Sequence, residues 1–165
     1  MAEVASHEVV LNKIVHIFTD GCCLGNPGRG GYGAILTYQQ HRRELTGGFR
    51  LTTNNRMELL ACIAGLEALT SECSVTITTD SQYVVNAIDK GWLDRWQGRG
   101  WRKSDNKPVE NVDLWKRLLG LLEKHRVNFK WIRGHSGHQE NERCDQLAKA
   151  AASREDLADD PGYAG

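Results

Sequence analysis

The stretch Ile17-Phe18-Thr19-Asp20-Gly21 is a short apolar run that ends in a carboxylate and is followed at once by glycine. A second stretch, Val75-Thr76-Ile77-Thr78-Thr79-Asp80, has the same form later in the chain. Alternating β-branched residues are typical of strands. Both stretches therefore predict an aspartate at the end of a strand, where a side chain on a rigid support can carry chemistry.

The rest of the hydrophobic pattern predicts an α/β fold around a five-stranded mixed sheet. Short links join the first three expected strands, which favours antiparallel pairing. Helical patterns precede the last two strands, which favours parallel pairing there and helices on both faces of the sheet. The expected strands are 13–19, 32–38, 42–51, 75–80 and 127–133, and the expected helices begin near Asn54, Ser81, Asn111 and Asn141.

The length of 165 residues favours a single domain, 1–165, with an N-terminal extension over 1–12 and a loose acidic tail over 154–165. The 21 Lys and Arg residues balance 21 Asp and Glu residues, so any nucleic-acid site must be a local basic patch. Five cysteines without paired CxxC spacing favour neither a disulfide framework nor a zinc site. Since no run is apolar and long enough to span a membrane and no signal peptide is evident, we expect a cytoplasmic protein.

The segment 21–31 is dense in glycine. Such a segment can lay backbone N–H groups against a phosphate, because no Cβ blocks the approach. A flexible hairpin connection between two strands explains the same composition equally well. The segment lacks the GxxxxGK[ST] spacing, which disfavours a nucleotide P-loop.

Two further acidic residues, Glu58 and Asp145, lie near the starts of expected helices. Taken singly, Glu58 is compatible with a capping box with Asn55, and Asp145 with a favourable charge at a helix N-terminus. Taken together with Asp20 and Asp80, both are expected at the edge where α/β sheets bind ligands. Crowded carboxylates repel one another unless cations lie between them, and oxygen ligands favour Mg²⁺ or Mn²⁺. Two such ions can stabilise the attacking and leaving oxygens of a phosphodiester.

Three of the five tryptophans lie in the segment 91–108, among five basic and two acidic residues. Cations interleaved with aromatic rings suit a sugar-phosphate backbone. The alternative is a small satellite core of tryptophans beneath a solvated, charged surface. A second loop, 134–138, contains His135, which can move a proton if it lies near the four acids.

An ordered set of motifs resembles the ribonuclease H family, in particular the bacterial type 1 enzymes known as ribonuclease HI, from about Lys13 to Tyr163. The motifs are Phe-Thr-Asp-Gly at Asp20, Gly-Asn-Pro-Gly at Asn26, Thr-Thr-Asn-Asn-Arg-Met-Glu-Leu at Glu58, Thr-Asp-Ser-Gln-Tyr-Val at Asp80, Asn-Val-Asp-Leu-Trp at Trp115, and Gly-His-Ser-Gly-His followed by Asn-Glu-Arg-Cys-Asp at Asp145.

This resemblance implies the ribonuclease H-like fold and an endonuclease that hydrolyses the RNA strand of RNA/DNA hybrids, leaving 5′-phosphate and 3′-hydroxyl ends. It implies that Asp20, Glu58, Asp80 and Asp145 bind two Mg²⁺ ions, which Mn²⁺ can replace, when substrate is bound. His135 would assist proton transfer and product release. Contacts to the hybrid are implied for Gly21, Cys23, Asn26, Asn54, Asn55, Gln82, Trp92, Trp96, Arg99, Trp101, Arg102 and Lys107.

The segment 91–108 and its flank depart from the family pattern, because Gln97, Gly98 and Glu110 stand where better-known members carry lysines. We therefore expect weaker and less salt-sensitive binding of the hybrid. Two alternatives remain open from the sequence: a non-catalytic hybrid-binding module, and a DNA nuclease on the same type of sheet. We expect a monomer whose partner is an RNA/DNA hybrid, with no membrane partner.

Overall fold

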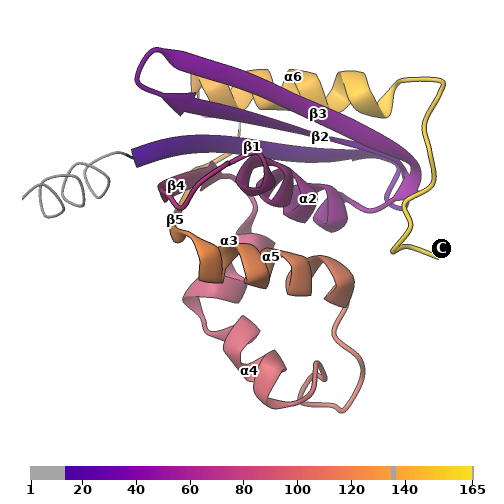
Figure 1. The fold of residues 1–165 in the computed structure, drawn as a ribbon. Coiled ribbons are helices and arrows are strands. Elements are labelled where there is room, and N and C mark those ends of the chain that lie inside the picture. Colours follow the sequence, from indigo (N-terminus) through magenta and orange to yellow (C-terminus); the bar gives the residue numbers. More distant parts are fainter. Residues whose placement is uncertain (1–13, 135–136, 165) are drawn as a thin grey trace, which may run out of the picture.

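A computed structural model describes residues 14–134 and 137–164. Its centre is a five-stranded sheet with the strand order β3-β2-β1-β4-β5 (Figure 1). Strands β1, β2 and β3 pair antiparallel, and β4 and β5 pair parallel to β1 and to β4 respectively. The predicted mixed sheet is confirmed. The strands are β1 (Ile14–Leu24), β2 (Gly28–Tyr38), β3 (His41–Thr52), β4 (Ser74–Thr79) and β5 (Arg126–Trp131).

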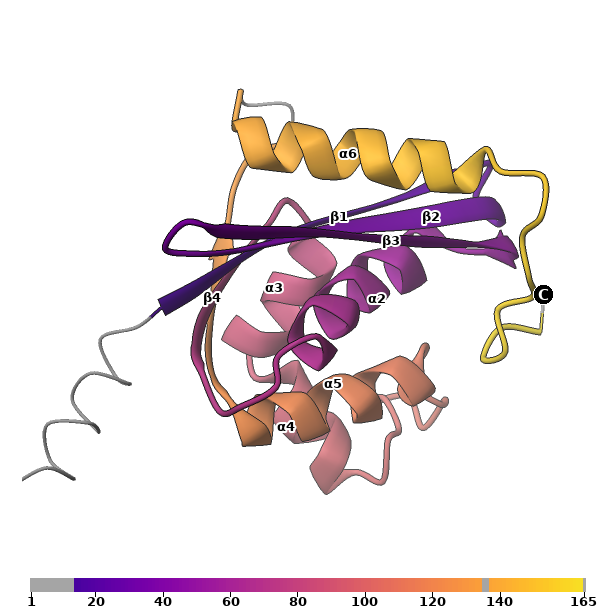
Figure 2. The same ribbon diagram turned by 45° about the horizontal axis from the view of Figure 1, so that its top comes forward.

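Helices cover both faces of the sheet, also as predicted (Figure 2). Of the described helices, only α6 (Gln139–Ala152) covers one face, and α2 (Asn54–Glu67) covers the other, with α5 (Val112–Lys124) beneath it. The helices α3 (Gln82–Asp89) and α4 (Trp92–Gly98) extend away from the sheet below α2 (Figure 1). The main core lies between the sheet and α2, where Ile17, Ile63 and Ile77 are fully buried. Among the described residues, no helix is both long and apolar enough to cross a membrane.

The glycine-rich segment 21–31 is mostly strand, and only 25–27 form the turn of a hairpin. Strand β1 continues past Asp20 to Leu24, and β2 already begins at Gly28. Glycine is required here by the approach of α6: a Cβ on Gly31 would lie 2.2 Å from the Ala148 carbonyl oxygen, and one on Gly33 2.6 Å from the Cys144 carbonyl oxygen. The hairpin reading of this segment is therefore closer to the structure than the phosphate-cradling reading.

Two helix starts also differ from the sequence-based expectation. The side chain of Thr53 caps α2 by accepting a hydrogen bond from the Arg56 N–H at 3.3 Å, so Asn55 and Glu58 form no capping box. Helix α6 begins at Gln139, with His138 at the N-cap position. Asn141 therefore lies inside α6, and Asp145 lies in its second turn and not in its first.

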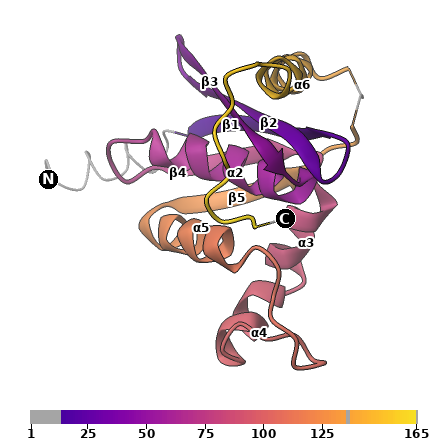
Figure 3. The ribbon, with the colours of Figure 1, turned by 90° about the vertical axis from the view of Figure 1, so that its right-hand side faces the viewer.

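The C-terminal segment is not the loose tail that its acidic composition suggested, at least over 157–160. Leu157 and Asp160 are buried, and the Arg50 N–H donates to the Ala158 carbonyl at 2.8 Å. The segment runs from α6 past β3 to α2 and α5 (Figure 3). There Asp160 forms an ion pair with Arg56, whose side chain is only 2% exposed. The N-terminal extension 1–12 lies outside the described residues.

Candidate active site

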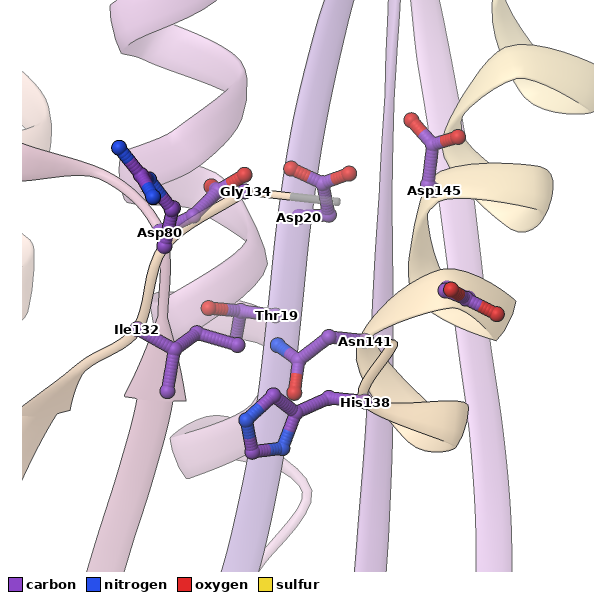
Figure 4. Close-up of a pocket in the computed structure, with 10 residues that line it drawn as sticks. Thr19, Asp20, Asp80, Ile132, Gly134, His138, Asn141 and Asp145 are labelled. Atoms are coloured by element: carbon purple, nitrogen blue, oxygen red, sulfur yellow. The ribbon is translucent and has the colours of Figure 1, made fainter. Parts of the chain in front are cut away.

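Three of the four predicted acids meet at one point. Asp20, Glu58 and Asp80 each offer an oxygen, and these oxygens all lie within 4.8 Å of one another. Asp20 comes from β1, Glu58 from the second turn of α2, and Asp80 from the residue that follows β4. In Figure 4, Asp20 lies between Asp80 and Asp145 in a shared pocket. Residues distant in the sequence thus form one carboxylate cluster.

The local sequence explains why these acids converge. Strands β1 and β4 are adjacent and parallel, which brings Asp20 and Asp80 to the same end of the sheet. Gly21 lets α2 approach β1, since a Cβ there would lie 2.5 Å from the Glu58 backbone nitrogen. The same glycine donates its N–H to Asp20 Oδ1 at 3.0 Å, which fixes that carboxylate.

The electrostatics of the cluster are unfavourable in the absence of a cation. Burial, and then the charges of Asp80 and Asp145, raise the pKa of Asp20 to about 8. Burial and the charges of Asp20 and Asp80 also raise the pKa of Glu58 well above its usual value. Within the part of the chain that the structure describes, Glu58 Oε2 is buried and has no hydrogen-bond partner. A buried carboxylate oxygen left unpaired is costly, so this donor set fits a hard divalent cation.

The fourth predicted acid, Asp145, lies in the same pocket but outside the cluster of three. Its charge and a hydrogen bond both act on Asp20. Its Oδ2 already has a cationic partner, because Lys149 Nζ lies 2.9 Å away on the next turn of α6. Lys149 belongs to no motif in the sequence, and its spacing of four residues from Asp145 is the one local signal for this pair.

The backbone around Asp80 is held by Trp131 and Ile132, which the sequence predicts only as strand, and by Asn141, which it predicts only as a helix start. The Trp131 indole Nε1 donates to the Asp80 carbonyl at 3.0 Å, and the Ile132 N–H donates to the Thr79 carbonyl at 3.0 Å. On the other side, Asn141 Nδ2 donates to the Thr78 carbonyl at 3.3 Å. These contacts tie the end of β4 to β5 and to α6. The predicted histidine, His135, lies outside the described residues.

Several predicted substrate contacts lie beside the acids, where the β1–β2 turn meets α2. Asn26 Oδ1 accepts a hydrogen bond from the Asn54 N–H at 3.1 Å, and the Cys23 thiol contacts the Thr52 carbonyl at 3.4 Å. Asn55 follows in the first turn of α2, and Gln82 opens α3 with an exposed side chain. Gly21 and Cys23 thus lie on β1 and Asn26 in the β1–β2 turn, while Asn54 and Asn55 begin α2 and Gln82 begins α3, two residues after Asp80.

The basic and aromatic segment combines both readings considered from the sequence. Trp96 packs edge-on against Trp115 with ring centroids 5.5 Å apart, as a satellite core would. A cavity of about 440 Å³ on the same segment is lined by two tryptophans, three cations and a serine, namely Trp92, Trp96, Arg95, Arg99, Lys103 and Ser104. Further along, the Lys116 ammonium lies over the Trp101 ring at 5.7 Å, and Arg102 donates to the Asn106 carbonyl. Lys107 is exposed. Trp96 therefore packs against the core residue Trp115, and basic side chains line the cavity beside Trp92 and Trp96.

Comparison with known proteins gives consistent matches. The family model described as RNase H matches residues 12–153. A protein named ribonuclease H from Syntrophus aciditrophicus is 61% identical over 151 residues, which cover 92% of this chain and 87% of the relative. A protein of the same name from Pectobacterium atrosepticum is 58% identical over 153 residues, covering 93% and 98%.

Solved structures agree in fold. LC9-RNase H1, described as a type 1 RNase H with the type 2 active-site motif, superposes with a TM-score of 0.76 at 33% identity, covering 85% of this chain and 72% of that one. LC11-RNase H1, solved in complex with an RNA/DNA hybrid, superposes with a TM-score of 0.64 at 24% identity, covering 84% and 96%. The second match supports the fold only.

Proposed function

The chain belongs to the ribonuclease H family, whose members cleave the RNA strand of RNA/DNA hybrids, and from this premise we propose that Asp20, Glu58, Asp80 and Asp145 are its catalytic acids. The observation that supports this most strongly is the cluster of Asp20, Glu58 and Asp80 with the buried, unpaired Glu58 Oε2. A scaffold gives no reason for such a cluster, because it costs stability.

The acids would hold two Mg²⁺ ions when the hybrid is bound, and Mn²⁺ can take their place. Such ions, when bound, activate water and stabilise the leaving oxygen of the phosphodiester. Asp20, Glu58 and Asp80 supply the nearest set of oxygens, and Asp145 closes the pocket from α6. Hydrolysis would leave 5′-phosphate and 3′-hydroxyl ends. His135, on the loop between β5 and α6, would assist proton transfer and product release.

The hybrid would lie across the acids and reach the basic segment on the far side of α3. Gly21, Cys23, Asn26, Asn54, Asn55 and Gln82 would contact the strands near the cut. Trp92, Trp96, Arg99, Trp101, Arg102 and Lys107 would grip the DNA backbone. Selectivity for a hybrid would come from 2′-hydroxyl contacts across the minor groove on one strand and from DNA shape on the other. We propose that the enzyme acts as a cytoplasmic monomer and that 1–165 forms one domain.

The direct test is a cleavage assay on RNA/DNA, RNA/RNA and DNA/DNA duplexes of one sequence, with and without Mg²⁺. We expect cleavage of the RNA strand of the hybrid only, and only with the metal. Binding of the hybrid without cleavage would identify a non-catalytic module, and cleavage of DNA/DNA would identify a DNA nuclease. End-group analysis of the product tests the 5′-phosphate assignment.

A further inference from the structure

Asp145 is paired with a cation that the chain itself supplies. Lys149 Nζ lies 2.9 Å from Asp145 Oδ2, and the two residues are one helical turn apart on α6. By contrast, Glu58 Oε2 is buried and has no hydrogen-bond partner among the described residues. The charge of Asp20 also acts on Lys149, so the ammonium lies within the field of a second acid of the site.

From this geometry we propose that Lys149 is a resident cation that competes with divalent metal for Asp145. This inference rests on the proposed metal site and deepens it. In the substrate-free enzyme, Lys149 neutralises Asp145 and weakens metal binding on the α6 side of the pocket. Lys149 is thus a positioning residue that acts through Asp145, and not a catalytic residue.

The side chain of Lys149 is suited to being displaced. It is 59% exposed, while Asp145 is 24% exposed. A lysine carries its charge on a flexible stem, and exposed pairs spaced by four residues on a helix are weak. Lys149 can therefore leave Asp145 for water at little cost when a divalent cation binds. The oxygens of Asp20, Glu58 and Asp80 lie within 4.8 Å of one another, so we expect this side of the pocket to bind metal first.

The test is a Mg²⁺ titration of the substrate-free enzyme followed by backbone amide NMR, which measures metal binding and not turnover. The amide of Gly21 reports the Asp20 side of the pocket, because it donates to Asp20 Oδ1, and the amide of Asp145 reports the α6 side, where Lys149 acts. The variants are Lys149→Gln, which removes the charge, and Lys149→Arg, which keeps it. Arg143→Gln is the matched control: it removes one cation from α6, but Arg143 pairs with Glu44 on β3 and not with Asp145.

We expect Lys149→Gln to bind Mg²⁺ about two- to fivefold more tightly than the wild type, as the loss of a weak ion pair implies. Lys149→Arg and Arg143→Gln should bind Mg²⁺ within about twofold of the wild type by the same argument.

Unchanged or weaker binding of Mg²⁺ by Lys149→Gln, while Asp20→Asn still reduces binding, would overturn the role of Lys149 and leave the metal site intact. An equal gain in Arg143→Gln would also overturn it, because any loss of charge on α6 would then suffice. If Asp20→Asn binds Mg²⁺ like the wild type, the proposed metal site fails together with this inference.

Discussion

At the scale of single residues, the main property of the site is that carboxylates are held together against their mutual repulsion.

Asp80 is the acid whose backbone is most clearly fixed, by the Trp131 indole and by the pairing of Thr79 with Ile132. We expect Asp80→Asn to lower Mg²⁺-dependent cleavage by on the order of 10³-fold or more, because metal ions contribute several kcal/mol to stabilising such transition states. Turnover on the hybrid measures the loss, and circular dichroism checks the fold. Near-normal turnover would remove Asp80 from the site.

Substitution of Glu58 should lower activity but raise the stability of the metal-free protein. Its carboxylate is buried beside Asp20 and Asp80, with one oxygen unpaired among the described residues. Glu58→Gln replaces an ionisable carboxyl of the cluster by a neutral amide of the same shape. We expect the metal-free variant to be more stable than the wild type by about 1–3 kcal/mol, and to have lost activity. Urea unfolding in EDTA measures this difference, with the exposed Glu123→Gln as the control. A less stable Glu58→Gln would show that the carboxylate is satisfied without metal.

His135 is predicted to be auxiliary, because a proton can also reach the leaving group through water. His135→Ala should slow turnover by about 10- to 100-fold, which is less than any of the acid substitutions, since general acid–base groups contribute about 10²–10⁴-fold. Steady-state and single-turnover rates on the hybrid distinguish a slow chemical step from slow product release. A collapse equal to that of Asp80→Asn would make the histidine indispensable.

At the scale of elements, the sequence predicted which segments are strands and helices better than it predicted where they end. The apolar alternation in β4 and β5 places both strands to within about two residues, which is the usual accuracy of pattern reading. The sequence predicts that the first strand ends at Thr19, because Gly21 and its neighbours are typical of a connection, whereas β1 continues to Leu24. Their glycines in fact serve contacts with α2 and α6 that are invisible in a local pattern.

Local patterns also predicted only part of the candidate site. The Asp20 and Asp80 positions followed from strand patterns, but Glu58 and Asp145 each had a local explanation until the motifs were taken together. The buried ion pair of Arg56 with Asp160 had no sequence signal at all, because it joins the start of α2 to a segment that looks disordered by composition. Long-range polar contacts of this kind have no period, so pattern reading does not find them.

The C-terminal segment should therefore stabilise α2, the helix that carries Glu58. Burial alone would raise the pKa of Asp160, but hydrogen bonds from Arg56 and Thr52 outweigh it and hold the pKa below its usual value. A carboxyl with a lowered folded-state pKa contributes stability above its unfolded pKa, and this is lost as pH falls through the folded pKa. The wild type should thus lose stability below about pH 4, where unfolded Asp titrates.

Asp160→Asn should be less stable than the wild type by about 2–4 kcal/mol at neutral pH, because it leaves the buried Arg56 without one ionic partner. Its stability should also depend less on pH below about 4, since the variant lacks the titrating group. Urea unfolding between neutral and acidic pH measures both effects. The control is Asp159→Asn, because the neighbouring Asp159 is exposed and pairs with Arg50 at the surface. Equal losses in both variants would mean that the buried pair adds nothing specific.

At the scale of the whole molecule, a net charge of zero has to be reconciled with binding a polyanion. The cations must act locally, and the cavity lined by Trp92, Arg95, Trp96 and Arg99 is the clearest concentration of them beside aromatic rings. This segment has glutamine and glycine at 97 and 98, where lysines are expected from the family resemblance. We therefore expect stacking to contribute a larger share of the binding free energy of the hybrid than phosphate contacts do, and stacking is less sensitive to salt.

The salt dependence of binding measures this balance directly. Each phosphate contact that is lost lowers the slope of log K against log salt by about one, so Arg99→Gln should weaken hybrid binding and reduce the slope by about that amount. Trp96→Phe should weaken binding with the slope unchanged, because stacking releases no counterions. Arg43→Gln, on the β2–β3 hairpin away from α4, is the matched control for loss of one exposed cation and should change neither quantity (Figure 1). The measurement is anisotropy of a labelled hybrid in EDTA, which prevents cleavage, over a series of salt concentrations. If Arg99→Gln and Arg43→Gln give the same slope as the wild type, α4 does not contact the backbone, and the hybrid must be held by the residues around the acids alone.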